Sequence, residues 1–504
     1  MQSSPRLSHR LLLSLLILGT VLALATTIAW PRAWGGVAPK RAHATTTYSS
    51  PLIITDDNYG TGTFTGSWES KDANVPTITV ATSKPVIIEN STLQGPGDLI
   101  LTTNTSNLTL RNTSGYGTNP NIAGRSKGNF IHTSQVTKLD MENNYIEGTD
   151  FGVYADGYSG SHSNDQTITI RANIGKNMDG RHSDGKGGYM TSQNDRSVSH
   201  FAQLNHMNDV PGIDISWNQV IDEPYNSSVD DVINIYQSGG TANSPLNIHD
   251  NYIQGAYPND PKTDGYSGGG IITDGGTDTQ DNATAYVHMY NNQVIDTANY
   301  GLAVANGHDN EIYNNRVISA GVLSDGTPIA SQNVGIYISD IYGGNITNGT
   351  FHDNHAHDNT IGWVDQHPNY AWNNYRNDMY FPVNDSDYGR NTALPNPITL
   401  DMEKAEFTSW RQKLSSAALT VGPPTTGPRD LGGLPHLDGY CQSLGDTGVS
   451  LDAKTAFDWH CDTSTGERVG MDMNAACQWH YPSATNVYAT YVMSDPYSWE
   501  CWSK

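Results

Sequence analysis

The chain has no cysteine before residue 441 and few cations anywhere. Lys and Arg together number 27 against 51 Asp and Glu, so the formal net charge of the 504 residues is −24. This balance argues against a nucleic-acid partner, because binding a phosphate backbone through counterion release needs a basic surface. A neutral polymer suits the chain better, as does a polyanion held through Ca²⁺.

Charge is also missing from residues 11–30. Two arginines and a histidine precede this run, and the small-residue site Ala-His-Ala follows it at 42–44. The pattern is typical of a secretory signal over residues 1–44. A run of this length also spans a bilayer, so an uncleaved N-terminal membrane anchor is the alternative. Either one places the rest of the chain outside the cytoplasm, secreted or held at the cell surface.

All four cysteines lie in the last 64 residues. An even number of cysteines confined to a short segment of an exported chain predicts two disulfides, with three pairings possible. Zinc binding is the alternative, although the segment has no close Cys-x-x-Cys pair. The four residues are Cys441, Cys461, Cys477 and Cys501.

Asparagine is unevenly spread, since 44 of the 46 fall between residues 51 and 400. In seven places an apolar residue is followed three positions later by an asparagine. We expect these asparagines to stack at one corner of successive coils with their amides bonded to one another. Asn also tolerates the left-handed conformation of a tight corner. A row of amides that binds sugar is the alternative. The seven are Asn144, Asn173, Asn218, Asn251, Asn292, Asn315 and Asn354.

A second phrase recurs in the same region, a Gly followed by a short β-branched strand that ends in a polar group. Examples are GIITDG at 270–275, GLAVAN at 301–306 and GIYISD at 335–340. Short strands joined by turns cannot bury a core alone, but stacked coils can. The variable gaps between repeats indicate insertions confined to particular loops. The predicted fold is all-β, a right-handed parallel β-helix with a small disulfide-bonded C-terminal domain.

The predicted β-helix covers residues 45–399. The amphipathic segment that follows predicts a capping helix within 400–420, packed against the last coil, because an open coil leaves an unpaired edge. Residues 421–433, rich in Gly and Pro, are predicted to be a linker. Residues 434–504 form the cysteine-containing module, whose many aromatic rings either stack on sugars or build its own small core.

The repeats MENNYIEG, SWNQVIDE, HDNYIQGA and YNNRVISA resemble the coils of right-handed parallel β-helix proteins of the pectate-lyase-like superfamily. The resemblance covers about residues 50–400. That superfamily includes pectate and alginate lyases, polygalacturonases and related glycoside hydrolases, uronan epimerases, phage tailspikes and non-catalytic surface proteins. The resemblance therefore implies the fold and a polysaccharide partner, while the shared fold does not select one chemistry.

Acidic residues are densest at 227–240 and 262–278. This arrangement is similar to that of polygalacturonases, which place an Asp pair on one coil and a Gly-His-Gly on the next. The present segment, NGHD at 306–309, lacks the second Gly. Acids one or two coils apart would lie about 5–10 Å apart, which suits the paired carboxylates of glycoside hydrolases. We therefore predict hydrolysis with four catalytic residues, Asp230, Asp231, Asp274 and His308.

Polar residues at equivalent strand ends are the predicted substrate ligands. Counting from the strands places Gln237, Asp274, Asn306 and Asp340 at similar positions on successive turns. The substrate-binding set is Asp264, Asp278, Asn306 and Asp340. The alternative for all of these acids is that they are solvated turn residues beside Gly, where Asp is common.

Two other functions fit the same fold. A Ca²⁺-dependent polysaccharide lyase needs a base, and the loop at 180–189 offers Arg181, His182 and Lys186 in a chain poor in cations. A non-catalytic carbohydrate-binding or adhesion protein would use the β-helix as a rigid spacer.

Metal signals in the sequence are weak. Hydrolysis through paired acids needs no cofactor, and Ca²⁺ is the possible one, at the acidic cluster or at NDSDYG, residues 384–389. Strand alternation would also place His355 and His357 on one face as a transition-metal pair. The alternative is that they are exposed corner residues.

Overall fold

The computed structural model describes residues 46–503 apart from 164–165, 331–332, 366–374, 425–428, 435–436, 453–454, 483, 485 and 492–498. The predicted signal or anchor at 1–44 lies outside the described residues. Among the helices that are described, none is both long and apolar enough to cross a membrane.

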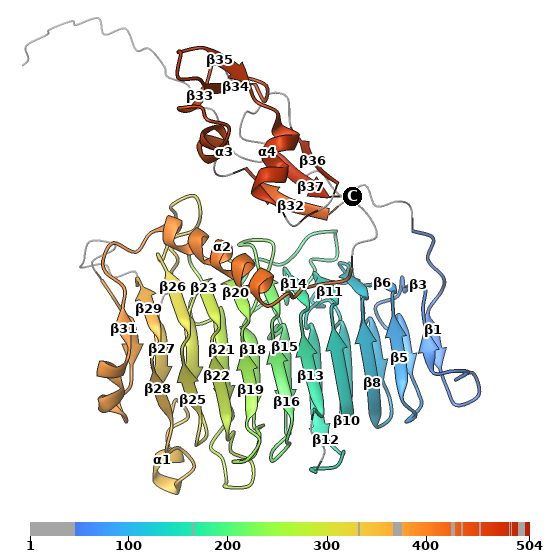
Figure 1. Cartoon of the computed structure of the whole chain (residues 1–504). Helices are drawn as coiled ribbons and strands as arrows, with labels where there is room; N and C mark the ends of the chain where they lie inside the picture. Colours follow the sequence, from blue (N-terminus) through green and yellow to red (C-terminus); the bar gives the residue numbers. More distant parts are fainter. Residues whose placement is uncertain are drawn as a thin grey trace, which may run out of the picture. The chain divides into compact units, whose positions relative to one another are not determined.

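Three parallel sheets wrap around one core (Figure 1). The first contains β1 (Leu52–Ile54), β4 (Ile78–Val80), β7 (Ile100–Thr102), β10 (Ile131–Glu142), β12 (Val153–Tyr158), β15 (Ala202–Asn205), β18 (Asp231–Tyr236), β21 (Gly269–Asp274), β24 (Tyr300–Val304), β27 (Val334–Ile338) and β30 (Met379–Tyr380). The second contains β2 (Thr63–Phe64), β5 (Val86–Glu89), β8 (Ser106–Arg111), β13 (Ile168–Arg171), β16 (Ile213–Ser216), β19 (Leu246–His249), β22 (Val287–Tyr290), β25 (Glu311–Tyr313) and β28 (His355–His357). The long strand β10 continues from the first sheet into the second.

The third sheet has 11 strands. They are β3 (Ser67–Glu69), β6 (Thr92–Gly95), β9 (Ser114–Gly117), β11 (Tyr145–Glu147), β14 (Ile174–Lys176), β17 (Gln219–Ile221), β20 (Tyr252–Ala256), β23 (Gln293–Thr297), β26 (Arg316–Ser319), β29 (Thr360–Trp363) and β31 (Thr392–Ala393). Each coil contributes one strand to each sheet, and every strand pairs in parallel with its counterpart one coil along. The fold is therefore the predicted parallel β-helix, with the right-handed winding of parallel crossover connections.

The core is built from columns of identical strand positions. In the second sheet one column consists of the apolar residue that begins the repeated phrase, and each member pairs with the next across the coils. All are fully buried, because alternate side chains of each strand point inward. The column runs through Leu110, Met141, Ile170, Ile215, Ile248, Met289, Ile312 and Ala356.

The predicted asparagine ladder is confirmed. Each side-chain amide donates to the Oδ1 of the next asparagine at 2.9–3.1 Å, and the same Oδ1 accepts the backbone N–H of the preceding one. A second donated bond reaches a carbonyl in the coil before. The ladder runs through Asn144, Asn173, Asn218, Asn251, Asn292, Asn315, Asn359 and Asn391.

Two details of the ladder differ from the prediction. Asn354 is not a member, because it accepts from Asn310 in a separate two-residue ladder, and Asn359 takes its place. The left-handed corner belongs to the residue before the ladder asparagine in the seven coils from Asn144 to Asn359, as at Trp217 with φ 57°. None of the ladder asparagines has a positive φ.

The helix α2 (Leu400–Ser416) begins at the Thr399 cap, whose side chain accepts from the Met402 N–H. We expected it to pack against the last coil. Its apolar residues join a cluster that includes Val364 and Leu394 of the last coils, and its polar residues bond to several earlier coils along the flank. Glu406 receives hydrogen bonds from Arg316 on β26 and from Gln293 on β23. The remaining short helices are α1 (Asn345–Asn348) and the 3-10 helix η1 (Asp385–Arg390).

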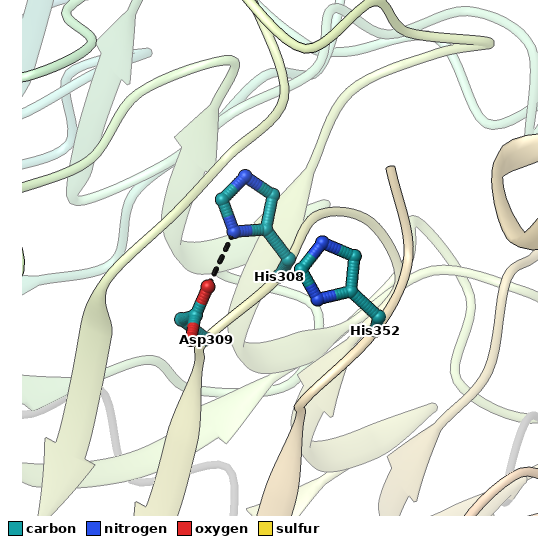
Figure 2. Close-up of side chains that lie close together, drawn as sticks. All are labelled: His308, Asp309 and His352. Carbon is teal, nitrogen blue, oxygen red and sulfur yellow. Dashed lines mark hydrogen bonds and ion pairs between the residues drawn. The ribbon is translucent and has the colours of Figure 1, made fainter. Parts of the chain in front are cut away.

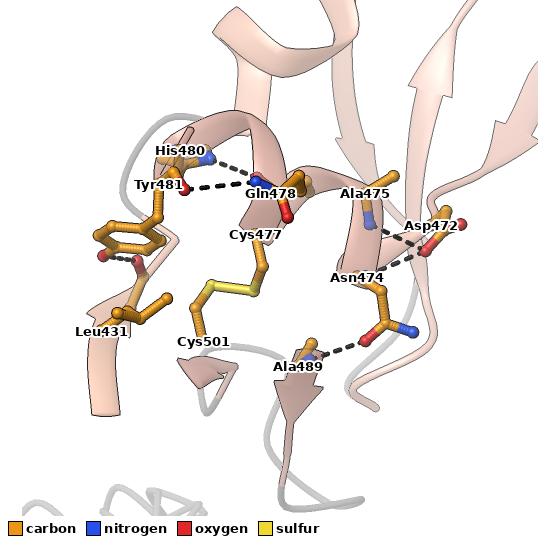
Figure 3. Close-up of a disulfide and its surroundings, with 12 residues drawn as sticks. Leu431, Asp472, Asn474, Ala475, Cys477, Gln478, His480, Tyr481, Ala489 and Cys501 are labelled. Atoms are coloured by element: carbon orange, nitrogen blue, oxygen red, sulfur yellow. Dashed lines mark hydrogen bonds between the residues drawn. A yellow bond between two sulfur atoms is a disulfide. The ribbon is translucent and has the colours of Figure 1, made fainter. Parts of the chain in front are cut away.

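The C-terminal module pairs its cysteines as Cys441–Cys461 and Cys477–Cys501, so the two predicted disulfides are present. Figure 3 shows the second bond joining a helix to a strand, with Asp472 accepting at the helix N-terminus. The elements of the C-terminal module are β32 (Arg429–Gly433), α3 (Leu437–Ser443), β33 (Gly448–Leu451), β34 (Trp459–Asp462), β35 (Arg468–Gly470), α4 (Met473–His480), β36 (Val487–Thr490) and β37 (Glu500–Ser503).

Candidate functional site

A pocket of about 550 Å³ lies on the first sheet, over β18, β21, β24, β27 and β30. Three of the four predicted catalytic residues, Asp230, Asp231 and Asp274, line it. Most of the remaining wall is aromatic or amide. The tyrosines and asparagines are Tyr266, Tyr300, Tyr337, Tyr342, Tyr380, Asn299, Asn333 and Asn377.

Asp231 is the buried acid of the pocket. Its Oδ1 accepts the Tyr300 hydroxyl and its Oδ2 accepts the Asn234 amide at 3.0 Å. Burial, helped by the neighbouring charge of Asp230, raises the pKa of Asp231 to about 8, although both hydrogen bonds act in the opposite direction. Burial therefore favours the protonated form of this carboxyl group.

The Asn234 amide nitrogen joins Asp231 to Asp274. It donates to an Oδ2 of each carboxyl group at 3.0 Å, so those two oxygens cannot be farther apart than twice that distance, 6.0 Å. Asp274 also accepts the Tyr342 hydroxyl and the Gly275 N–H. The two acids lie on adjacent coils, one at the start of β18 and the other at the end of β21, and their side chains converge.

A glycine makes the contact between Tyr300 and Asp231 possible. Asp231, Gly269 and Tyr300 share one register on three successive coils. Because the middle residue has no side chain, the tyrosine ring crosses over Gly269 to reach the carboxyl group two coils away. A Cβ at Gly269 would overlap the Tyr300 ring and lie 2.6 Å from the Asp231 Oδ1.

The charged groups that line the pocket are all acidic. Among the described residues, its lining includes no Lys, Arg or His. The Asp230 carboxyl group accepts a hydrogen bond from the Arg196 guanidinium at 2.8 Å. The buried Oδ1 atoms of Asn234 and Asn299 have no protein hydrogen-bond donor in the described part of the chain. Such acceptors need donors from a ligand or from water.

His308 does not belong to this pocket. It lies in the turn before β25, where its ring stacks on His352 at 4.7 Å between centroids. The sequence placed it with the acids because the segment NGHD, one coil after them, is similar to the Gly-His-Gly of polygalacturonases. The chain turns into the second sheet between the two residues, so the histidine leaves the face that carries the carboxyl groups.

The predicted substrate ligands are absent from the described lining of the pocket, and each is held in a turn. Asp264 accepts the Asp260 N–H, and Asp278 accepts the Gln237 amide and the Gly276 N–H. Asp340 accepts four consecutive backbone N–H groups that open α1, and the Asn306 amide donates to the Gly276 carbonyl.

Strand register explains why Asp274 differs from these residues. Asp274 pairs with Tyr236, not with Gln237 as the sequence count implied. In the same register, Asn306 and Asp340 lie one position farther along their coils than the residues aligned with Asp274. A one-residue offset turns a side chain to the opposite face, so Asp274 reaches the pocket and the other two do not.

Of the three basic residues proposed for a lyase, Arg181 is held in an ion pair. Arg181 binds both carboxylate oxygens of the buried Asp179, which also receives the Lys127 ammonium group at 2.6 Å. The Arg181 guanidinium lies over the Tyr189 ring. Asp387, within the predicted Ca²⁺ segment, is likewise paired, with Arg390 and His355.

Sequence reasoning missed Tyr300, Tyr337, Tyr342 and Asn234. Tyr300 and Tyr337 are buried within otherwise apolar strands, where a tyrosine is indistinguishable from a core residue. One signal was available, since the glycine run at 268–270 leaves Gly269, the residue that pairs with Tyr300, without a side chain. A tyrosine beside such a glycine has room to fold along the stack.

The sequence matches no protein-family model, and no curated protein sequence matches it. Among solved structures, the chain is similar to a mannuronic acid specific polysaccharide family 6 lyase from human gut microbiota. The two are 10% identical, and the match covers 74% of this chain and 90% of that chain with a TM-score of 0.28. A likeness of this size carries no information about activity.

Proposed function

We propose that the protein is a glycoside hydrolase that acts on an extracellular polysaccharide in the pocket over β18–β27. The observation that carries the proposal is the Asn234 amide held between Asp231 and Asp274. It keeps a protonated acid and a second carboxyl group within 6.0 Å of each other, beside a wall of tyrosines. Paired carboxyl groups with different environments are the machinery of glycoside hydrolysis.

The two acids take different roles. Asp231, with its raised pKa, donates a proton to the glycosidic oxygen as the bond to the leaving group breaks. The Asp274 carboxylate faces the sugar carbon that becomes positively charged and attacks it. A separation of at most 6.0 Å favours the retaining mechanism, whose carboxyl groups lie about 5–5.5 Å apart, over the inverting one at about 6.5–9.5 Å. Water then releases the sugar, with Asp231 acting as base.

The charge of the pocket supports a neutral polysaccharide as the substrate. The carboxyl groups of Asp230 and Asp274, with no described cation in the lining, would repel a uronate. The exposed rings of Tyr266, Tyr342 and Tyr380 offer flat apolar faces for sugar stacking. The unpartnered amide oxygen of Asn299, which lines the pocket, can accept a sugar hydroxyl group.

A polysaccharide panel tests the proposal directly. Neutral and uronate polymers are incubated with the protein and assayed for new reducing ends and for unsaturated products that absorb in the ultraviolet. We expect reducing ends without unsaturated products from a neutral polymer, unaffected by chelator. Unsaturated products would instead establish the lyase, and binding without any cleavage would establish the adhesion protein.

The pH dependence of the rate should follow Asp231. A proton donor acts only while protonated, so kcat/KM should fall as the pH rises through about 8, the pKa that burial gives this residue. Initial rates of reducing-end release across the pH range measure this. An alkaline limb centred near the ordinary Asp pKa of about 4 would contradict the assignment.

Replacing Gly269 with Ala should disable the pocket without removing any functional group. The new Cβ would displace the Tyr300 ring and crowd Asp231, so we expect kcat/KM to fall by about tenfold or more. The matched control is Gly265→Ala in the nearby loop, where an added Cβ meets nothing within 4 Å. Equal rates for the two variants would show that the Tyr300 contact does not matter.

A further inference from the structure

We infer that His308, Asp309 and His352 form a binding site for a first-row transition-metal ion of the Zn²⁺ type. One candidate ligand atom from each of the three lies within 4.8 Å of the others. In the part of the chain that the structure describes, no other group of three His, Cys, Asp or Glu residues brings its ligand atoms this close together. Figure 2 shows the two imidazoles side by side with the carboxylate at their edge.

The coil geometry builds this cluster. His308 and His352 form a bridge between adjacent coils, each three places before a strand of the second sheet, β25 and β28. Their rings are nearly parallel, at 9°, with centroids 4.7 Å apart. The backbone N–H of Asp309 donates to the His352 carbonyl, which fixes the two corners to each other. The 43 residues between the two histidines leave the coil and return, so only the folded chain brings these ligands together.

Hydrogen bonds already orient the imidazoles. The His308 Nδ1 lies 2.7 Å from the Asp309 Oδ2, and the His352 Nδ1 lies 2.9 Å from the Asp353 Oδ2. Carboxylates beside ligand histidines fix the ring orientation and raise the basicity of the imidazole in metal sites.

The donor set selects the metal class. Two imidazole nitrogens and one carboxylate suit Zn²⁺, Ni²⁺ or Cu²⁺, whereas Ca²⁺ and Mg²⁺ prefer oxygen ligands alone. Tetrahedral Zn²⁺ with bonds of about 2.0–2.2 Å needs its ligands about 3.3 Å apart, so the cluster must close by roughly 1.5 Å. The His352 side chain, 43% exposed, has the freedom to rotate inward, and the fourth position is open to water.

The role of such an ion would be to fasten one coil to the next beside a long insertion. The segment between the two histidines contains β25, β26, β27 and α1, including the loop that places Tyr342 at the pocket. A metal bound to the folded form alone stabilises it in proportion to the logarithm of its concentration. The site is separate from the carboxyl groups of the pocket and does not depend on the proposed hydrolysis.

Zn²⁺ titration of the full-length, chelator-treated protein tests the site. By calorimetry at neutral pH we expect one Zn²⁺ per chain, with the dissociation constant raised about tenfold or more by His308→Ala and by His352→Ala. Co²⁺ in place of Zn²⁺ should give visible absorption bands of a four-coordinate site that both variants lose. Circular dichroism of each variant checks that the fold is retained.

The matched control is His357→Ala. The His357 Nδ1 also bonds to the following aspartate, Asp358, at 2.8 Å, and its ring is stacked on a flat neighbour at 8°. That neighbour is Tyr313, which offers no imidazole nitrogen, so this variant should bind Zn²⁺ within about twofold of the wild type. The inference is overturned if the wild type binds no Zn²⁺, if both cluster variants bind as tightly as it does, or if His357→Ala weakens binding equally.

Discussion

Asp231→Asn is expected to lower reducing-end release by about 10²–10⁴-fold, the contribution of a general acid, while leaving polymer binding within about threefold. The amide keeps the size of the side chain and can still meet Tyr300 and Asn234, but it cannot donate a proton to a leaving group. Asp274→Asn should have a comparable effect because it removes the nucleophile. Rates on the polymer identified by the panel, and cosedimentation with its insoluble form, separate catalysis from binding.

Asp278→Asn is the control for these two variants. It replaces a buried carboxyl group that the sequence also singled out. Asp278 follows Asp274 in the same coil but lies outside the pocket lining. Its rate should stay within about threefold of the wild type, since its partners are a glutamine amide and a backbone N–H. If Asp231→Asn retained full activity while folded, the proton donor would have to be another residue.

Asn315→Ala should destabilise the β-helix by about 2–4 kcal/mol. The substitution removes the Oδ1 that accepts both the backbone N–H and the amide of Asn292, and the amide that donates to the Met289 carbonyl. These groups are buried in a coil of 23 residues, where water cannot replace the lost partners. Each buried group left unsatisfied costs about 1–3 kcal/mol. Denaturant unfolding followed by circular dichroism measures the change.

The adjacent residue supplies the comparison. Asn314 is exposed and adopts the left-handed conformation at φ 55°, so Asn314→Ala loses no buried partner and costs only the backbone preference, about 1 kcal/mol. If Asn315→Ala were as stable as Asn314→Ala, the amide ladder would contribute little to the free energy of unfolding.

The fold was predictable because its determinants repeat along the chain. The apolar residue and the asparagine three places later return on seven successive coils, from Asn144 to Asn359, so their columns can be aligned without coordinates. Asn354 was misplaced because a second corner, at Asn310, uses the same spacing. Nothing in a periodic pattern distinguishes two corners of one coil.

The candidate site was predictable only in part, because it depends on register between coils. Asp231 and Asp274 were found from acidic density. Their link through Asn234, and the passage of Tyr300 over Gly269, depend on which residues pair across strands. His308 was misassigned for the same reason. The position of a turn within a coil decides which sheet a residue belongs to. Because loop lengths vary from coil to coil, the sequence does not show where that turn falls.

The amide ladder also sets how such a chain can change its length in evolution. Consecutive ladder asparagines are separated by 23–45 residues, yet each remains one hydrogen bond from the next. A loop can therefore grow or shrink with no effect on the neighbouring coils, which leaves the pocket rim free to diversify. The stack itself can lengthen only by whole coils, each adding about 4.8 Å and one new asparagine. We therefore expect duplication of a whole coil to disturb the stack less than loss of a single ladder residue.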